Sequence, residues 1–131
     1  MGEDKVVLVL DASLTTRKII EVILHREGYQ VIGFENPREA LHYLAQHRQQ
    51  LPDLVFVGLR LPGVDGYRVL QYLKGEPCYR TIVTIALLTQ ADGPLGQLKA
   101  RLAGARQTMF KPLVRQRIVA LVAEHIGHAA R

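Results

Sequence analysis

The sequence predicts an α/β domain with a five-stranded parallel sheet and helices on both faces. Apolar segments of strand length alternate five times with longer segments of helical period, and no repeat, low-complexity tract or linker interrupts them. The chain has 131 residues, 48% of them hydrophobic, without the run of about 18 apolar residues that a membrane span needs. These observations indicate one globular domain with a sizeable core.

The first part of the chain supplies two strands and two helices. Residues 6–10 are continuously apolar, which is typical of a parallel strand buried on both faces. A helix is expected over 14–27, with Gly28 as its stop, and residues 30–34 form a short second strand. The segment Asn36-Pro37-Arg38-Glu39 then opens a helix, because it combines a capping residue, a first-turn proline and a glutamate three residues after the cap.

The middle of the chain continues the alternation. Residues 54–57 form the third strand, a short helix over 67–74 ends at Gly75, and residues 82–88 form the fourth strand. Residues 93–103 are expected to be helical in their later half, where three leucines line up at helical spacing: Leu95, Leu98 and Leu102.

The last part of the chain supplies a short edge strand over 108–110 and a final helix over 114–126. The apolar face of that helix consists of Val114, Ile118, Leu121, Val122 and Ile126. Because parallel crossovers are right-handed and must be covered, the predicted architecture is a flavodoxin-like, doubly wound sheet with strand order 2-1-3-4-5 and five helices.

Ligands of such sheets bind beyond the carboxyl ends of the central strands. Four of the five predicted strands end at or just before Asp11-Ala12, Gly58, Thr89 and Lys111-Pro112, and the loop over 61–66 reads Leu-Pro-Gly-Val-Asp-Gly. In this order and spacing the chain resembles the receiver domain of response regulators, of the chemotaxis-regulator kind. The resemblance covers residues 5–127, so we take these as the domain and residues 128–131 as a C-terminal tail or the start of a linker.

The resemblance implies a pocket that has lost its usual chemistry. Receivers place an acidic pair after the first strand and a phosphate-accepting aspartate after the third, and their carboxylates hold a magnesium ion. Here Ala12 replaces the second acid and Gly58 stands at the acceptor position, where no side chain can be phosphorylated. One carboxylate, on Asp11, and a backbone carbonyl make a poor octahedral magnesium site. We therefore expect no phosphorylation, no magnesium and no other cofactor in a pocket formed by Asp11, Ala12, Gly58, Thr89 and Lys111.

The retained residues have structural interpretations that need no phosphate. Asp11 is expected to form an ion pair with Lys111 or to cap the following helix. Thr89 is expected to be a strand-end threonine that bonds to loop backbone. The resemblance also implies a cis peptide bond between Lys111 and Pro112.

Positive charge is concentrated late in the chain. Lys and Arg number 17 against 12 Asp and Glu, and no acid occurs from Gly93 through Ala123. This stretch is either a solvated basic surface or a docking face for an acidic partner. Receivers use their fourth helix, fifth strand and last helix for dimerisation and output, so the predicted interaction face comprises Lys99, Arg101, Thr108, Arg115 and Arg117.

Two features of this face depart from the family. Thr108 stands where receivers commonly carry an aromatic switch residue. Gly93 and Gly96 weaken the first turn of the fourth helix by up to about 1 kcal/mol each, so a mobile helix is expected.

The leading hypothesis is a non-enzymatic, phosphorylation-independent signalling module of a two-component or phosphorelay system. Its partner would be an effector domain or another regulator, or a second copy of the chain. The alternatives are a receiver phosphorylated on another carboxylate, Asp11 or Asp53, and a basic nucleic-acid-binding module, for which charge is the sole support. The single cysteine, Cys78, and the absence of a visible signal peptide lead us to expect a cytoplasmic protein without membrane association.

Overall fold

The computed structural model describes residues 4–129 and contains a five-stranded parallel sheet in the order β2-β1-β3-β4-β5. The strands are β1 (Val6–Leu10), β2 (Gln30–Phe34), β3 (Leu54–Gly58), β4 (Val83–Leu88) and β5 (Gln107–Phe110). The helices are α1 (Leu14–Arg26), α2 (Pro37–Gln46), α3 (Gly66–Gly75), α4 (Gly93–Ala103) and α5 (Arg115–Ile126), with a short 3-10 helix, η1 (Pro77–Tyr79), before β4. The predicted fold class and strand order are confirmed.

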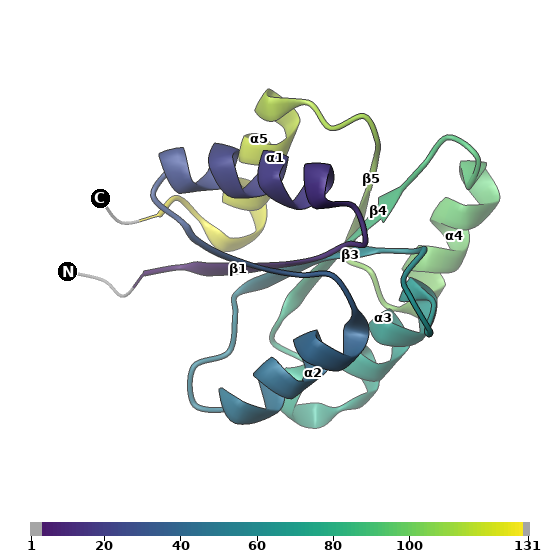
Figure 1. The fold of residues 1–131 in the computed structure, drawn as a ribbon, viewed down its shortest axis with the longest axis horizontal. Helices are drawn as coiled ribbons and strands as arrows, with labels where there is room; N and C mark the ends of the chain where they lie inside the picture. Colours follow the sequence, from purple (N-terminus) through teal and green to yellow (C-terminus); the bar gives the residue numbers. More distant parts are fainter. Residues whose placement is uncertain (1–3, 130–131) are drawn as a thin grey trace.

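Helices cover both faces of the sheet (Figure 1). Helices α1 and α5 lie on one face, and α2, α3 and α4 lie on the other. Each face has its own apolar core, and alternate residues of one strand contribute to opposite cores. Val7 and Val9 pack with Ile20 of α1 and Ile118 of α5, whereas Leu8 packs with the helices of the other face. Continuous apolar strands therefore follow from burial on both sides.

Capping side chains fix where helices begin. The Asn36 side chain accepts a hydrogen bond from the Glu39 amide at 3.0 Å, as the sequence predicted for the start of α2. Asp65 caps α3 in the same way, through the Arg68 amide at 3.0 Å. The cap of α1 is Ser13, which accepts a hydrogen bond from the Thr16 amide at 3.2 Å. Asp11, which the sequence offered as an alternative cap, lies two residues before Ser13 and does not cap this helix.

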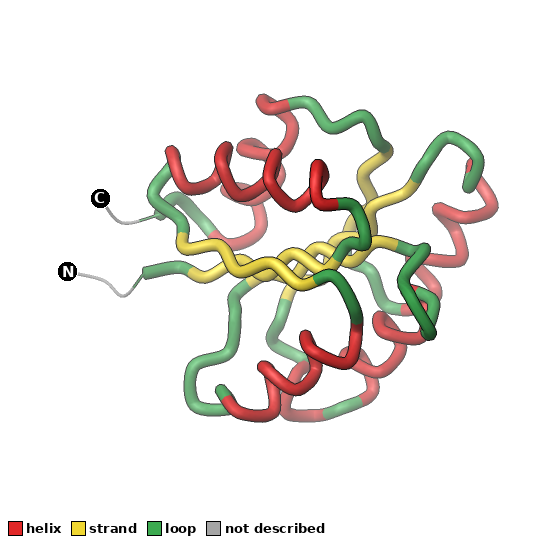
Figure 2. Tube along the Cα trace, viewed as in Figure 1, coloured by secondary structure: helices red, strands yellow, loops and turns green. Residues whose placement is uncertain are grey.

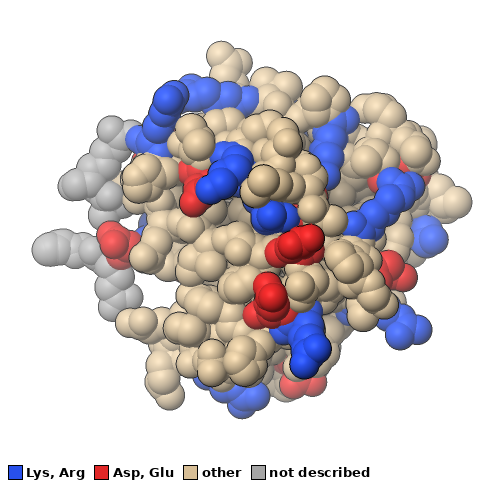
Figure 3. Space-filling view, viewed as in Figure 1, with Lys and Arg blue, Asp and Glu red and all other residues tan. Residues whose placement is uncertain are grey.

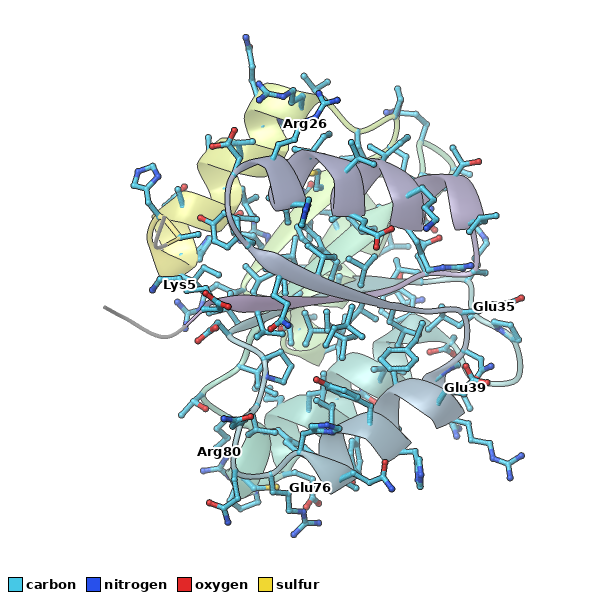
Figure 4. All side chains as sticks on the ribbon, turned by 60° about the vertical axis from the view of Figure 1, so that its left-hand side comes forward. Lys5, Arg26, Glu35, Glu39, Glu76 and Arg80 are labelled. Carbon is cyan, nitrogen blue, oxygen red and sulfur yellow. The ribbon has the colours of Figure 1, made fainter. Side chains whose placement is uncertain are left out.

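Because the strands are parallel, their carboxyl ends meet at one edge of the sheet. Figure 4 shows Lys5, which precedes β1, at the opposite end of the sheet from Glu35, which follows β2. The loops after the strands appear in green at that carboxyl edge in Figure 2. Asp11, Gly58, Thr89 and Lys111 are brought together there.

Helix α4 differs from the prediction. It is helical from Gly93 onward, and its buried face consists of small residues: Gly96, Ala100 and Ala103. A Cβ atom added at Gly96 would lie 2.7 Å from the Asp92 Cβ and 3.3 Å from the Tyr67 hydroxyl oxygen, so α4 packs too closely for a larger residue there. The aligned leucines identified the helix, but they lie on its solvent side.

The chain ends are only partly described. Of the predicted tail, residues 130 and 131 lie outside the described residues. Within residues 4–129, no helix has the length and apolar character required to cross a membrane.

Candidate functional site

The carboxylate of Asp11 is the centre of the site at the carboxyl edge of the sheet. The residue is 3% exposed. The Lys111 ammonium lies 2.9 Å from Oδ2 and donates a hydrogen bond to Oδ1 at 3.2 Å. Oδ1 also accepts a hydrogen bond from the Ser13 amide at 2.9 Å, and the Arg17 guanidinium donates to the Asp11 carbonyl oxygen at 2.7 Å. The predicted ion pair between Asp11 and Lys111 is confirmed.

This carboxylate fills the space above Gly58. A Cβ atom built at Gly58 would lie 2.5 Å from Oδ2 of Asp11 and 3.0 Å from its Cγ. Those distances are below normal van der Waals contact, so any side chain at position 58 requires Asp11 to move. The Gly58 carbonyl is also closely covered, because a Cβ at Gly66 would lie 2.1 Å from its oxygen. The Lys111–Pro112 peptide bond is cis, as the resemblance implied.

We expect Gly58→Ala to lower the free energy of unfolding by about 1–3 kcal/mol, because Asp11 must shift away from its present contacts with Lys111 and Ser13. Chemical denaturation measures this change. Gly75→Ala is the matched control, since a Cβ there meets nothing within 4 Å. The control should be neutral or stabilising by up to about 1 kcal/mol in a helix. An equal effect of the two substitutions would contradict the close contact at Gly58.

A second cluster lies beside the ion pair and joins the loops after β3 and β4. The Thr89 hydroxyl accepts a hydrogen bond from the Arg60 guanidinium at 3.0 Å and donates one to Oδ2 of Asp92 at 3.1 Å. The same Asp92 oxygen accepts the Thr89 amide at 2.7 Å, and Arg60 forms an ion pair with Asp92 at 3.3 Å. The prediction that Thr89 bonds to loop backbone is wrong, because its hydroxyl bonds to side chains.

Asp92 is the residue that ties this cluster to α4. It immediately precedes the helix, and its carbonyl oxygen accepts the Gly96 amide at 2.9 Å. Nearby, the Tyr67 hydroxyl donates to the Gly96 carbonyl at 3.4 Å. Burial raises the pKa of Tyr67, with smaller contributions in the same direction from Asp92 and Asp65 and an opposing one from Arg60. These contacts hold the first turn of α4, where two glycines led us to expect mobility.

Asp92→Ala should therefore destabilise the domain by about 1–2 kcal/mol and speed amide hydrogen exchange in the first turn of α4. Arg60→Ala is the comparison. Its side chain is 65% exposed, so removing it should cost no more than about 1 kcal/mol. Unchanged exchange in α4 after Asp92→Ala would show that the cluster does not hold the helix.

The crevice between these groups is small. Its volume is about 40 Å³, and it is lined by Asp11, Leu59, Arg60, Leu87, Thr89, Asp92 and Lys111. Small-molecule sites usually occupy about 300 Å³ or more, so this space suits a few water molecules. Among residues 4–129, no three His, Cys, Asp or Glu side chains are grouped closely enough to hold a metal ion.

The predicted interaction face is only partly assembled. Thr108 is 7% exposed, and its hydroxyl accepts a hydrogen bond from the Gln97 side-chain amide at 2.8 Å, so it cannot lie on an exposed face. The Lys99 ammonium lies 5.0 Å from the centre of the Tyr67 ring, which turns it toward α3. Arg115 pairs with Glu27 at 3.2 Å beside α1. Arg101 and Arg117 are exposed and form no ion pair with any residue between 4 and 129.

Basic side chains are also interspersed with acidic ones elsewhere on the surface. Figure 3 shows Lys and Arg in separate groups on the face that it draws, with Asp and Glu between them. The excess of positive charge is therefore not one continuous patch on that face.

Sequence reasoning missed Arg60 and Asp92, which hold Thr89. The available signal was weak: a cation two residues after the third strand, and an acid three residues after Thr89 and just before the fourth helix. Asp53, the other candidate carboxylate, lies elsewhere. Its Oδ2 accepts the Val6 amide at 2.9 Å at the start of β1, on the opposite edge of the sheet from Thr89.

Comparison with known proteins supports the resemblance. The chain is 28% identical over 120 residues to protein PilG of Pseudomonas aeruginosa. The aligned region covers 92% of this chain and 86% of PilG. It is 27% identical over 125 residues to the polar-differentiation response regulator DivK of Brucella anthropi, with coverages of 95% and 98%. By contrast, it spans 23% of the response regulator PleD of Caulobacter vibrioides, at 30% identity over 108 residues.

Solved structures show the same architecture. The signal receiver domain of a histidine kinase from Syntrophus aciditrophicus superposes with a TM-score of 0.83 at 30% identity, covering 93% of this chain and 89% of that one. The chemotaxis response regulator CheY4 of Vibrio cholerae shares the fold, with a TM-score of 0.84 at 20% identity and coverages of 95% and 100%. The family model of the response regulator receiver domain matches residues 7–123. The chain belongs to the response regulator receiver family.

Proposed function

We propose that this domain is a phosphorylation-independent receiver, a non-enzymatic module of a two-component or phosphorelay pathway that signals by binding another protein. The observation that carries the proposal is the contact between Gly58 and Asp11. A Cβ at Gly58 would lie 2.5 Å from the Asp11 carboxylate, so the space that an acceptor side chain requires is filled by an ion-paired group. We also propose that the domain, residues 5–127, acts in the cytoplasm.

The groups that would assist phosphoryl transfer are engaged with each other. In-line transfer depends on positioned cations and a metal ion that stabilise the transferring group. Here Lys111 neutralises Asp11, and Arg60 and Asp92 satisfy the Thr89 hydroxyl. A phosphoryl group would have to replace all of these contacts, and we propose that none arrives.

The residues present do not fit the magnesium ion that the family uses. Magnesium needs nearly octahedral oxygen ligands at about 2.0–2.1 Å. Asp11 carries the Lys111 ammonium on both of its oxygens, and Asp92 is held by Arg60 and Thr89. Neither carboxylate offers an open ligand without losing a cationic partner, and Ala12 and Gly58 offer no side-chain oxygen. We therefore propose a domain that works without magnesium or any other cofactor.

Phosphorylation on another carboxylate is less well supported. Asp53 lies at the amino edge of the sheet, away from Thr89 and Lys111, and Asp11 is buried in its ion pair. The nucleic-acid alternative has little support as well. Of the basic residues that suggested it, Lys99 lies over an aromatic ring and Arg115 is paired with an acid.

Beryllium fluoride with magnesium mimics an aspartyl phosphate and tests this proposal. We expect no rise in melting temperature when both are added, because no acceptor carboxylate and no metal site are available. A receiver domain with an intact acceptor aspartate serves as the positive control under the same conditions. A rise of several degrees for this domain would contradict phosphorylation independence.

A further inference from the structure

A second cavity lies at the amino edge of the sheet, at the opposite end of the strands from Asp11. Residues of α3, η1 and β4 and of the loop between α4 and β5 line it, and its volume is about 350 Å³. Arg80, which lines it, lies in Figure 4 toward the same end of the domain as Lys5 and away from Glu35. Small-molecule sites begin at about 300 Å³, so this cavity has room for a small ligand.

Among residues 4–129, three cations line this cavity and no acid does. Lys74 comes from the last turn of α3, Arg80 follows η1, and Arg106 directly precedes β5. All three residues are exposed, and none of them forms an ion pair within the part of the chain that the structure describes. Like charges around one space repel one another, so the arrangement does not stabilise the empty domain. It suits an anion.

The cations are held at the cavity by its backbone. Gly104 ends α4 with φ at 124°, and a Cβ there would lie 2.8 Å from the Lys74 Cδ, so the lysine stem lies directly against the glycine. The Thr84 hydroxyl donates to the Gly104 carbonyl at 3.1 Å, and the Arg106 amide donates to the Thr84 carbonyl at 2.8 Å. Because these segments are already fixed, less freedom is lost when a ligand binds.

The remaining wall is largely apolar. Leu73, Tyr79 and Ile82 line the cavity and are otherwise buried, with exposures of 1%, 3% and 7%. Lys74 alone has a sufficient structural interpretation, because a cation in the last turn of α3 complements the helix dipole. Arg80 and Arg106 lie outside the α-helices. The lining therefore combines groups that recognise an anion with side chains that contact an uncharged body.

We propose that this cavity binds a small organic phosphate, a phosphomonoester with a partly apolar body. Such a group carries about 1.5 to 2 negative charges and three acceptor oxygens at neutral pH, and the guanidinium fork matches its geometry. A carboxylate would leave more of the positive charge uncompensated. The phosphoryl group stays on the ligand, so binding is non-covalent. The inference goes beyond the proposed function, because the residues that line this cavity all differ from those around Asp11.

Titration of phenyl phosphate into the ¹⁵N-labelled domain, without magnesium, tests the proposal. We expect saturable shifts concentrated in residues 73–84 and 104–106, with a dissociation constant of about 1 mM or lower that rises with salt. Benzoate and inorganic phosphate should each bind at least about fivefold more weakly. Equal affinity for benzoate would overturn the choice of phosphate, and equal affinity for inorganic phosphate would overturn the organic body. Absence of shifts in these residues would overturn the site.

An oligothymidylate of about eight nucleotides separates a small ligand from a nucleic-acid backbone, which carries similar phosphate chemistry. It should bind more weakly than phenyl phosphate, because a polymer backbone cannot enter a cavity of this size. Tighter binding to the same residues would make nucleic acid the occupant and overturn the proposal.

Variants separate the cavity from general attraction to a basic protein. Arg80→Gln combined with Arg106→Gln should weaken binding of phenyl phosphate by at least about tenfold. The melting temperature of the unliganded variant should stay unchanged or rise, because like charges are removed. The control, Arg38→Gln with Arg117→Gln, removes the same charge from exposed residues outside the cavity lining and should bind normally. Equal loss in the two variants would overturn the site. Neither variant alters Asp11 or Lys111, so failure here leaves phosphorylation independence standing, and phosphoryl incorporation would leave this result standing.

Discussion

Lys111→Met is expected to lower the free energy of unfolding by about 2–4 kcal/mol. The substitution removes the charge that neutralises Asp11 but leaves the carboxylate in place, and an uncompensated buried charge is strongly destabilising. The Asp11 side chain is 4% exposed and that of Lys111 is 26% exposed, so the expected loss lies somewhat below that of a fully buried pair. Urea denaturation monitored by circular dichroism measures the change.

Lys18→Met is the matched control for this substitution. Lys18 also forms an ion pair, with Glu21 at 3.1 Å, but its side chain is 65% exposed. Exposed pairs of this kind contribute from near zero to about 1 kcal/mol. Similar losses in the two variants would contradict this expectation and mean that burial at Asp11 does not decide the energy of the pair.

Gly58→Asp combined with Ala12→Asp should have two opposite effects. Without magnesium, the double variant should lose several kcal/mol of stability, on the order of 2–5, because three carboxylates then crowd one cleft and repel one another. Asp11 must also give way, since the Cβ at position 58 would lie 2.5 Å from its Oδ2. With magnesium, part of the loss should return, because the metal binds the folded state alone.

The size of that recovery follows from mass action. Magnesium at ten times its dissociation constant would restore about 1.4 kcal/mol. Titration calorimetry should detect affinity in the millimolar range in the double variant. If no affinity is found, the retained residues can no longer form a magnesium site even with the two acids restored. Lys111 and the cluster around Asp92 would then be the groups to vary next.

Most of the fold could be predicted from the sequence because local signals agreed with one another. Continuous apolar strands, the cap at Asn36 and the stop at Gly75 each marked an element, and the structure contains them. The ion pair of Asp11 with Lys111 was also predictable, because both residues follow strands whose carboxyl ends meet. A sequence specifies a single fold when its local propensities, hydrophobic pattern and helix caps all favour the same structure.

The parts that the sequence did not predict depend on contacts between loops and on which helix face is inward. Arg60 reaches Thr89 across 29 positions of sequence, and no local pattern identifies such a pair. In α4 the leucines have the spacing of a core face, but the small residues beside them allow closer packing and take that place. The family position of Thr108 predicts a surface residue, but in β5 it is 7% exposed and accepts a hydrogen bond from Gln97 of α4, a contact that no motif encodes.

The central claim is that this receiver takes no phosphate, and intact-protein mass spectrometry after incubation with acetyl phosphate and magnesium tests it most directly. A receiver with an intact acceptor aspartate, treated in parallel, shows that the reagent is active. We expect the mass of this domain to stay unchanged while that of the control rises by one phosphoryl group. A phosphoryl adduct on this domain, at Asp11, Asp53 or any other carboxylate, would contradict it.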